Sequence, residues 1–120
     1  MNIAACDGDL TLSTWPEIEN FLLERARTAP DDIWLNGDAE YPCLAILVNG
    51  RHACVHYFLN DQGDMWQSVG DGGNDICFLV NGEHTEMPAD SVISLEDAIA
   101  CAKHFFDSPG RPDCIEWREL

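Results

Sequence analysis

Basic residues are scarce in this chain, and their scarcity excludes one large class of function. The 120 residues include 6 Lys plus Arg against 22 Asp plus Glu, which gives a formal charge of −16 at neutral pH. Proteins that hold nucleic acid gain much of their affinity by neutralising phosphates with Lys and Arg. We therefore exclude direct binding of nucleic acid and expect any charged partner to be basic.

Membrane-spanning runs and the signs of secretion are also missing. No stretch approaches the roughly 18 apolar residues that cross a bilayer, and residues 1–7 have neither the basic nor the apolar region of a signal peptide. We expect a cytoplasmic protein with no membrane partner. Six cysteines would allow three disulfides in a secreted chain, but the missing signal and their apolar neighbours favour buried, reduced thiols.

Length and apolar content predict one folded domain over residues 1–120. Hydrophobic residues make up 46% of the chain, with four Trp and five Phe, which is enough to exclude an acidic disordered tail. Two segments have helical patterns. The first begins near Ser13, where Thr14 and Glu17 form a capping box, and the second is capped at Ser94.

The middle of the chain, from about residue 32 to residue 87, alternates short apolar runs with turn residues. Asn49-Gly50 between two such runs favours a type I′ hairpin turn. A last strand is predicted over residues 114–118, and we interpret Trp15, Trp34 and Trp117 as a helix staple or as strand residues of the core. We predict an α+β fold in which an antiparallel sheet of about five to six strands carries two helices.

One short pattern suggests a metal site. His52, Cys54 and His56 alternate on one predicted strand, so their side chains share a face of the sheet. A fourth ligand such as His84 would have to come from elsewhere, and the Cys-x-x-Cys spacing of many zinc sites is absent. A small metal-binding protein or metal-dependent enzyme is therefore the alternative function. Otherwise Cys54 belongs to the core and the histidines flank it.

Two other kinds of active site are disfavoured. Nothing in the sequence marks a thiol with a lowered pKa, and nearby carboxylates disfavour a thiolate. The glycine-rich residues 70–73 lack the Lys-Ser or Lys-Thr of a phosphate loop, and their aspartate would repel phosphate. We expect no catalytic residue and no cofactor.

A family pattern occupies the second half of the chain. It reads Val92-Ile93-Ser94-x-Glu96-Asp97-Ala98, then Ala102-x-x-Phe105-Phe106, then Arg111-Pro112-x-x-Ile115-x-Trp117-x-Glu119-Leu120. This pattern resembles the immunity-protein family that accompanies deaminase toxins in bacterial polymorphic toxin systems. The middle hairpin and the loop at residues 70–73 fit the same layout, so the resemblance covers roughly residues 32–120.

The resemblance implies a small α+β antitoxin that binds one cognate toxin domain, one-to-one, and blocks it without doing chemistry. The expected toxin is a nucleic-acid cytosine deaminase with a basic substrate groove. A charge of −16 suits this partner, because it attracts a basic groove at long range and raises the association rate. A general acidic mimic of nucleic acid would instead bind basic proteins broadly, with strong salt dependence.

Tight inhibition needs apolar anchors that lose contact with water at the centre of the interface. Trp66 lies between acidic turns, although burial in the core explains a tryptophan equally well. Trp66, Tyr57 and Met65 are the candidate anchors, and acidic loops would form the rim or pair with Arg and Lys of the toxin. The predicted partner-binding residues are Tyr57, Asp61, Asp64, Met65, Trp66, Asp71 and Asp75.

Overall fold

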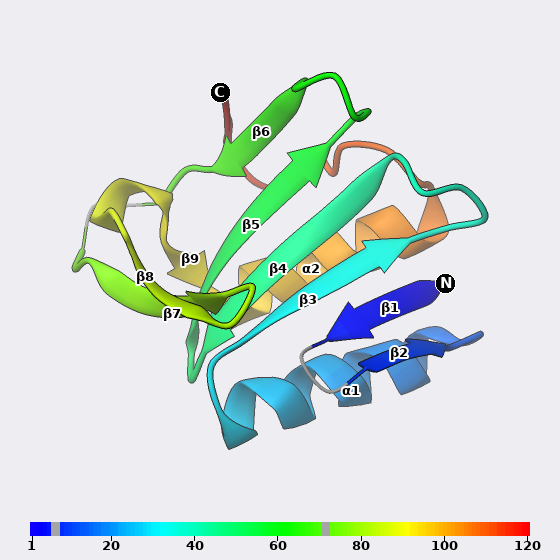
Figure 1. The fold of residues 1–120 in the computed structure, drawn as a ribbon, viewed down its shortest axis with the longest axis horizontal. Helices are drawn as coiled ribbons and strands as arrows, with labels where there is room; N and C mark the ends of the chain where they lie inside the picture. The colour runs from blue at the N-terminus through cyan, green and yellow to red at the C-terminus, as the bar shows by residue number, and fades with distance from the viewer. Residues whose placement is uncertain (6–7, 71–72) are drawn as a thin grey trace.

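A twisted antiparallel sheet forms the centre of the fold (Figure 1). The computed structural model describes residues 1–5, 8–70 and 73–120. Within them the strands lie in the order β10-β6-β5-β4-β3-β1-β2, and β9 pairs with β5 beside this path. The strands are β1 (Asn2–Ala5), β2 (Gly8–Thr11), β3 (Asp31–Asn36), β4 (Cys43–Asn49), β5 (His52–Phe58), β6 (Met65–Ser68), β9 (Ile93–Ser94) and β10 (Trp117–Glu119).

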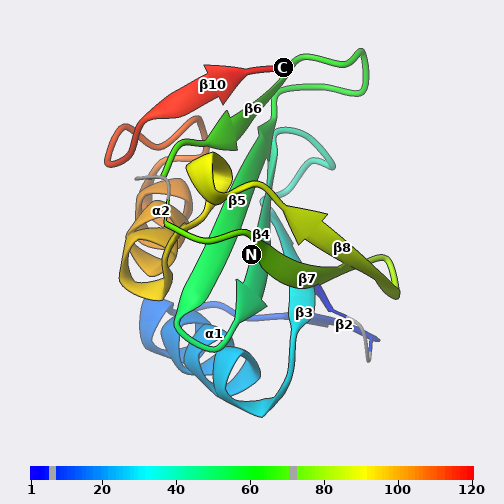
Figure 2. The ribbon, with the colours of Figure 1, turned by 90° about the vertical axis from the view of Figure 1, so that its left-hand side faces the viewer.

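Both predicted helices are confirmed, and both lie on the same face of the sheet (Figure 2). They are α1 (Trp15–Thr28) and α2 (Leu95–Asp107). At the start of α1 the Thr14 N–H donates to Glu17 Oε1 at 3.2 Å, as the capping box predicts. At the start of α2 the Ser94 hydroxyl accepts the Asp97 N–H at 3.1 Å.

The main core lies between the helices and the sheet. Ile18 and Leu22 of α1 and Phe105 of α2 are at most 1% exposed. They belong to one cluster with side chains of alternate strand positions, namely Ile33, Leu35, Leu44, Ile46, Val48, Val55 and Tyr57. Because side chains alternate along a strand, the residues between these positions face the opposite side of the sheet.

A separate hairpin covers part of that opposite face. It consists of β7 (Ile76–Val80) and β8 (Glu83–Met87), joined by a turn in which Asn81 and Gly82 both have positive φ. A short 3₁₀ turn, Ala89–Ser91, follows it. Phe78 of β7 is fully buried in a second small core. Both strands lie in the region, residues 32 to 87, where the sequence alternates apolar runs with turns, whereas their placement against the sheet follows only from the tertiary contacts.

The α+β class is confirmed, and the main sheet has eight strands within the described residues, more than the predicted five to six. The additional strands are short: four residues each in the β1–β2 hairpin and two in β9. The last strand also differs, since it spans Trp117–Glu119 rather than residues 114–118. The Trp117 indole N–H donates to the Pro112 carbonyl at 2.6 Å, which holds the residues between them in a loop.

The β4–β5 hairpin is confirmed, but its turn differs from the predicted type. Asn49 pairs with His52, so the central residues are Gly50 and Arg51. Gly50 has a φ of 61°, and Arg51 is not among the described residues with positive φ. A type I′ turn needs positive φ at both central residues. The turn centre is displaced by one residue because the register must keep the apolar side chains of both strands on their own faces.

The described cysteines are free thiols, but the expected burial holds for only three of the five. Cys43, Cys54 and Cys101 are buried, whereas Cys77 and Cys114 are exposed. Neither helix of the described residues is long and apolar enough to cross a membrane.

Gly70 lies where the chain leaves β6 and passes against the segment before α2. Its N–H donates to the Asp90 carbonyl at 2.7 Å. A Cβ at this position would overlap the carbonyl oxygen of Val92. The close approach of the two backbones therefore requires glycine.

We expect Gly70→Ala to lower the free energy of unfolding by about 1 to 3 kcal/mol, the usual cost of overpacking. Gly37→Ala is the matched control, because a Cβ there meets nothing nearer than Pro109 Cγ at 4.0 Å. Its stability should lie within about 0.5 kcal/mol of the unmodified protein. Urea unfolding measures both, and equal stabilities would contradict the backbone contact.

Candidate partner-binding surface

The turn between β5 and β6 presents two of the predicted acidic residues, Asp61 and Asp64, and both are exposed. The Asn60 side chain donates to Asp64 Oδ2 at 2.9 Å and accepts the Gln62 N–H at 2.9 Å. The Leu59 N–H donates to the Asp64 carbonyl at 3.0 Å, which closes the turn. Both carboxylates are therefore held in solvent at one end of the sheet.

Tyr57 and Trp66 face the helices and pack against each other across β5 and β6, with ring centroids 5.7 Å apart. Tyr57 is only 3% exposed, whereas Trp66 is half-buried. Burial raises the pKa of the Tyr57 phenol, and the positive charge of Arg111 acts in the opposite direction. The Arg111 guanidinium also lies 4.9 Å from the centroid of the Trp66 ring. Tyr57 thus supports Trp66 from within, and Trp66 already holds a cation of its own chain.

A shallow hollow beside Trp66 contains residues that the sequence analysis did not assign to the site. Trp117 lies edge-on to Tyr57, with ring centroids 6.4 Å apart. The sequence contained part of the signal for this hollow, because the family pattern includes Arg111, Pro112 and Trp117. The hollow has a volume of about 560 Å³ and is lined by Trp66, Arg111, Pro112, Asp113, Ile115, Trp117 and Glu119.

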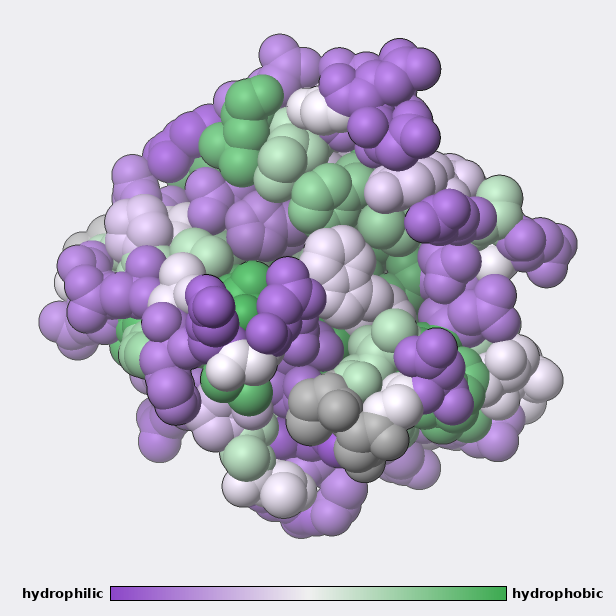
Figure 3. Space-filling view, in the orientation of Figure 1, coloured by the Kyte–Doolittle hydropathy of each residue, from purple (hydrophilic) through white to green (hydrophobic). Residues whose placement is uncertain are grey.

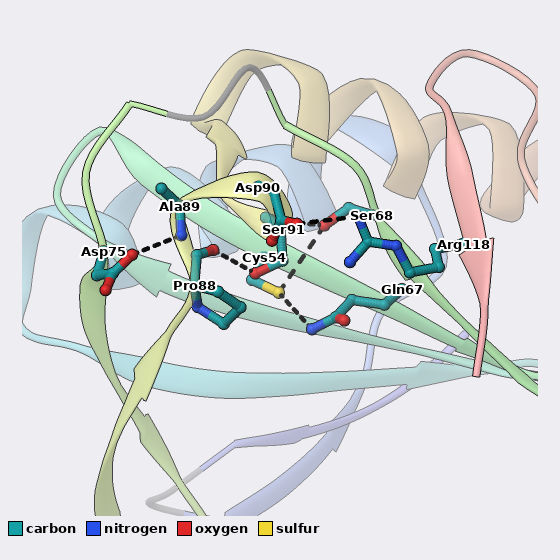
Figure 4. A network of polar contacts seen from close by, with 9 residues as sticks. All are labelled: Cys54, Gln67, Ser68, Asp75, Pro88, Ala89, Asp90, Ser91 and Arg118. Carbon is teal, nitrogen blue, oxygen red and sulfur yellow. Dashed lines mark hydrogen bonds and ion pairs between the residues drawn. The ribbon is translucent and has the colours of Figure 1, made fainter.

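The other predicted residues lie apart from Trp66. Met65 pairs with Phe58 and therefore faces the side of the sheet opposite the helices. Asp75 precedes β7, where its Oδ1 accepts the Ala89 N–H at 2.8 Å (Figure 4). Asp71 lies outside the described residues. The structure thus brings Asp61, Asp64, Met65 and Trp66 to one end of β5 and β6, but on different faces, and it places Asp75 elsewhere.

The predicted metal-binding pattern does not form a site in the part of the chain that the structure describes. Cys54 is fully buried, and its Sγ lies 3.9 Å from Gln67 Nε2 and 3.8 Å from Ser68 Oγ (Figure 4). His52 is exposed at the end of β5, while His56 is half-buried. No group of three or more His, Cys, Asp and Glu side chains is positioned to hold a metal there. The metal-binding alternative thus has no support from this geometry.

Ser68 has a structural role at this place instead. Its hydroxyl donates to the Ser91 carbonyl at 2.7 Å and accepts the Val55 N–H at 3.1 Å (Figure 4). Nearby, Arg118 of β10 forms an ion pair with Asp90 at 3.0 Å. These contacts join β5, β6, β10 and the segment before α2. The two Ser68 hydrogen bonds also satisfy polar groups that burial would otherwise leave without partners, whereas the Arg118–Asp90 ion pair is exposed.

Comparison with known proteins identifies the family. The profile of the family described as Immunity protein Imm1 matches residues 7–119. The chain belongs to the Imm1 immunity protein family. It is also similar to a double-stranded DNA deaminase immunity protein of Burkholderia cenocepacia (strain H111). The two chains are 29% identical over 119 residues, which cover 95% of each. The expected relationship to immunity proteins is confirmed.

The burial of His56 predicts a dependence of stability on pH for this Imm1 protein. Burial lowers the pKa of its imidazole from the ordinary value of 6.5. Between the lowered pKa and about 6.5 the unfolded chain therefore binds a proton that the folded chain does not. The stability that the neutral ring contributes is complete above this range and is lost as the pH falls through it.

We expect His56→Gln to remove this dependence, because glutamine does not titrate. Urea unfolding at pH 7.5 and pH 5 measures it for both proteins. Between pH 7.5 and pH 5 the unfolding free energy of the unmodified protein should fall by more than that of the variant. A difference that stays constant with pH would show that the folded protein does not hold this imidazole in its neutral form.

Proposed function

We propose that this Imm1 protein binds a cognate toxin domain of the deaminase class, one-to-one, and inhibits it by covering its active site or substrate groove. Its membership of the Imm1 family carries this proposal. The name of the similar double-stranded DNA deaminase immunity protein supports the class of toxin. In this proposal residues 1–120 act as one immunity domain, in the cytoplasm of the cell that makes the toxin, and they catalyse no reaction.

The charge of the chain supports a partner that acts on nucleic acid. A deaminase whose substrate is DNA must attract phosphates, so its substrate groove is basic. A protein of charge −16 is attracted to such a groove over distances near the Debye length, roughly 8 to 10 Å at physiological salt. The same charge keeps the immunity protein away from nucleic acid.

The β5–β6 end of the sheet is the contact that we propose first. Asp61 and Asp64 are exposed there, and Met65 and Trp66 follow them on β6. Tyr57 supports Trp66 from the core, with a ring separation of 5.7 Å. We assign Asp71 and Asp75 to additional acidic contacts at the rim.

Co-expression with the deaminase domain encoded beside this gene tests the proposed function. We expect a one-to-one complex in a pull-down at raised salt and loss of cytosine deamination on double-stranded DNA. Unrelated basic proteins should not be captured under the same conditions, because a specific interface also uses contacts that salt does not screen. Absence of a complex, with deamination unchanged, would reject the proposal. Broad capture that disappears with salt would favour a general mimic of nucleic acid.

We expect Asp61→Lys to slow association with the toxin domain by roughly 3- to 10-fold at low salt, because it removes attraction at the contact. Glu24→Lys is the matched control: it changes the charge equally, but it lies on α1, where Glu24 makes an exposed ion pair with Arg27. Stopped-flow kinetics at two salt concentrations measures both. Equal association rates for the two variants would remove the β5–β6 turn from the contact.

A further inference from the structure

The side of the sheet opposite the helices is only partly covered. The β7–β8 hairpin crosses one end of it, and among the described residues no helix or strand lies over the other end of β3, β4, β5 and β6 (Figure 1). We call this area the open face. Cross-strand pairing places Trp34 beside Ala45, Ala45 beside His56, and Phe58 beside Met65. The open face is defined by these five residues.

Aromatic side chains occupy the centre of the open face. The rings of Trp34 and Phe58 are stacked, with centroids 5.3 Å apart and planes 22° apart. His56 lies 6.2 Å from Phe58, and Met65 adjoins Phe58 on β6. All four side chains are half-buried rather than covered. Figure 3 shows pale and green surface over the middle of this side, surrounded by purple hydrophilic side chains.

The Trp34 ring is fixed before any partner arrives. Its indole N–H donates to Asp32 Oδ2 at 3.2 Å, and the same oxygen accepts the Asn81 N–H of the hairpin turn at 3.1 Å. Asp32 itself is only 6% exposed. An aromatic side chain that is already held in place loses little conformational entropy on binding, which suits an interface anchor.

Two acidic loops lie at the end of the open face. Asp38 and Glu40 belong to the loop before β4, and Asp61 and Asp64 belong to the β5–β6 turn; all four are exposed. Burial raises the pKa of the Tyr41 phenol, and the charges of Glu40 in one loop and Asp61 in the other raise it further, so both loops act on this side chain. The sequence from residue 28 to residue 50 and from residue 52 to residue 102 contains no Lys or Arg. Neither loop therefore contains a Lys or Arg side chain that could neutralise these carboxylates.

We infer that the open face, with the Trp34–Phe58 stack as its anchor, is the surface that docks on the basic margin of the toxin's substrate groove. This inference rests on the proposed function and names the surface that performs it. It narrows the contact proposed first: Met65 and the acidic turn stay in it, whereas Tyr57 and Trp66, which face the helices, lie outside it. The partner supplies apolar contacts opposite the stack and Arg or Lys side chains opposite the two loops.

A second copy of this chain fits the open face less well than a basic partner does. Two copies docked through it would bring acidic loops toward one another while each molecule carries a charge of −16. A basic protein meets the same loops with charges of opposite sign. Charge complementarity therefore selects the partner, and the apolar centre provides the contact that remains when salt screens the charges.

Phe58→Ala tests the inference directly. We expect its Kd for the deaminase domain to rise at least tenfold, mainly through faster dissociation, as for truncation of a central aromatic anchor. Phe21→Ala is the matched control, because Phe21 is also half-buried but lies on α1, 5.0 Å from the Arg25 guanidinium. Its Kd should change by less than about twofold. Urea unfolding shows that each variant is folded.

Oxidation of the unmodified protein gives a second measurement that needs no variant. Hydrogen peroxide converts accessible methionine to its sulfoxide, and both Met65 and Met1 are half-buried. We expect the deaminase domain to slow the oxidation of Met65 and to leave that of Met1 unchanged. This result would support the open face even if Phe58→Ala failed to fold.

The outcomes separate the surface from the function. A complex in which Phe58→Ala binds normally and Met65 oxidises at its free rate overturns the inference and leaves the proposed function intact. Loss of binding in Trp66→Ala with none in Phe58→Ala would assign the contact to the other face. A dimer of the free protein that Phe58→Ala disrupts would give the open face to a second copy. Absence of any complex with the unmodified protein rejects both proposals.

Discussion

The burial of β4 on both of its faces is the constraint on which the rest of the structure depends. Residues 43–48 are all buried, and β4 pairs with β3 on one side and β5 on the other. Ile46 faces the helices, while Leu47 packs in the small core with Phe78 of the hairpin. A slip of one residue would exchange these two faces. The register is therefore fixed, and with it the residues of β3 and β5 that remain uncovered.

Polar contacts then connect the hairpin to the face that it leaves open. The Asn49 side chain donates to the Cys77 carbonyl at 2.8 Å, and Asp32 joins the hairpin turn to the indole of Trp34. A buried carboxylate loses its hydration, so it is stable only where hydrogen bonds replace the lost water. Asp32 meets this condition with groups from both elements. The position of the hairpin and the orientation of the Trp34 ring therefore depend on the same side chain.

Local signals in the sequence predicted the parts of the fold that local interactions determine. The capping box at Thr14, the cap at Ser94 and the β4–β5 hairpin are confirmed, because each rests on residues close in sequence. Alternation along a strand predicts which residues share a face, but not which of the two faces the helices cover. Trp34 was interpreted as core and Tyr57 as a surface anchor, since which face the helices cover depends on the topology. Tyr57 is 3% exposed, whereas Trp34 is half-buried on the side without helices.

Charge and apolar contact have different roles in the proposed interface, and this sequence keeps them on separate residues. Coulombic attraction acts before contact and raises the association rate, while burial of aromatic surface slows dissociation. An exposed aromatic stack without charge around it would promote self-association. A charge of −16 opposes that association, and the same carboxylates attract a basic partner. In the proposed interface the acidic composition therefore both directs binding and protects the apolar face until the partner covers it.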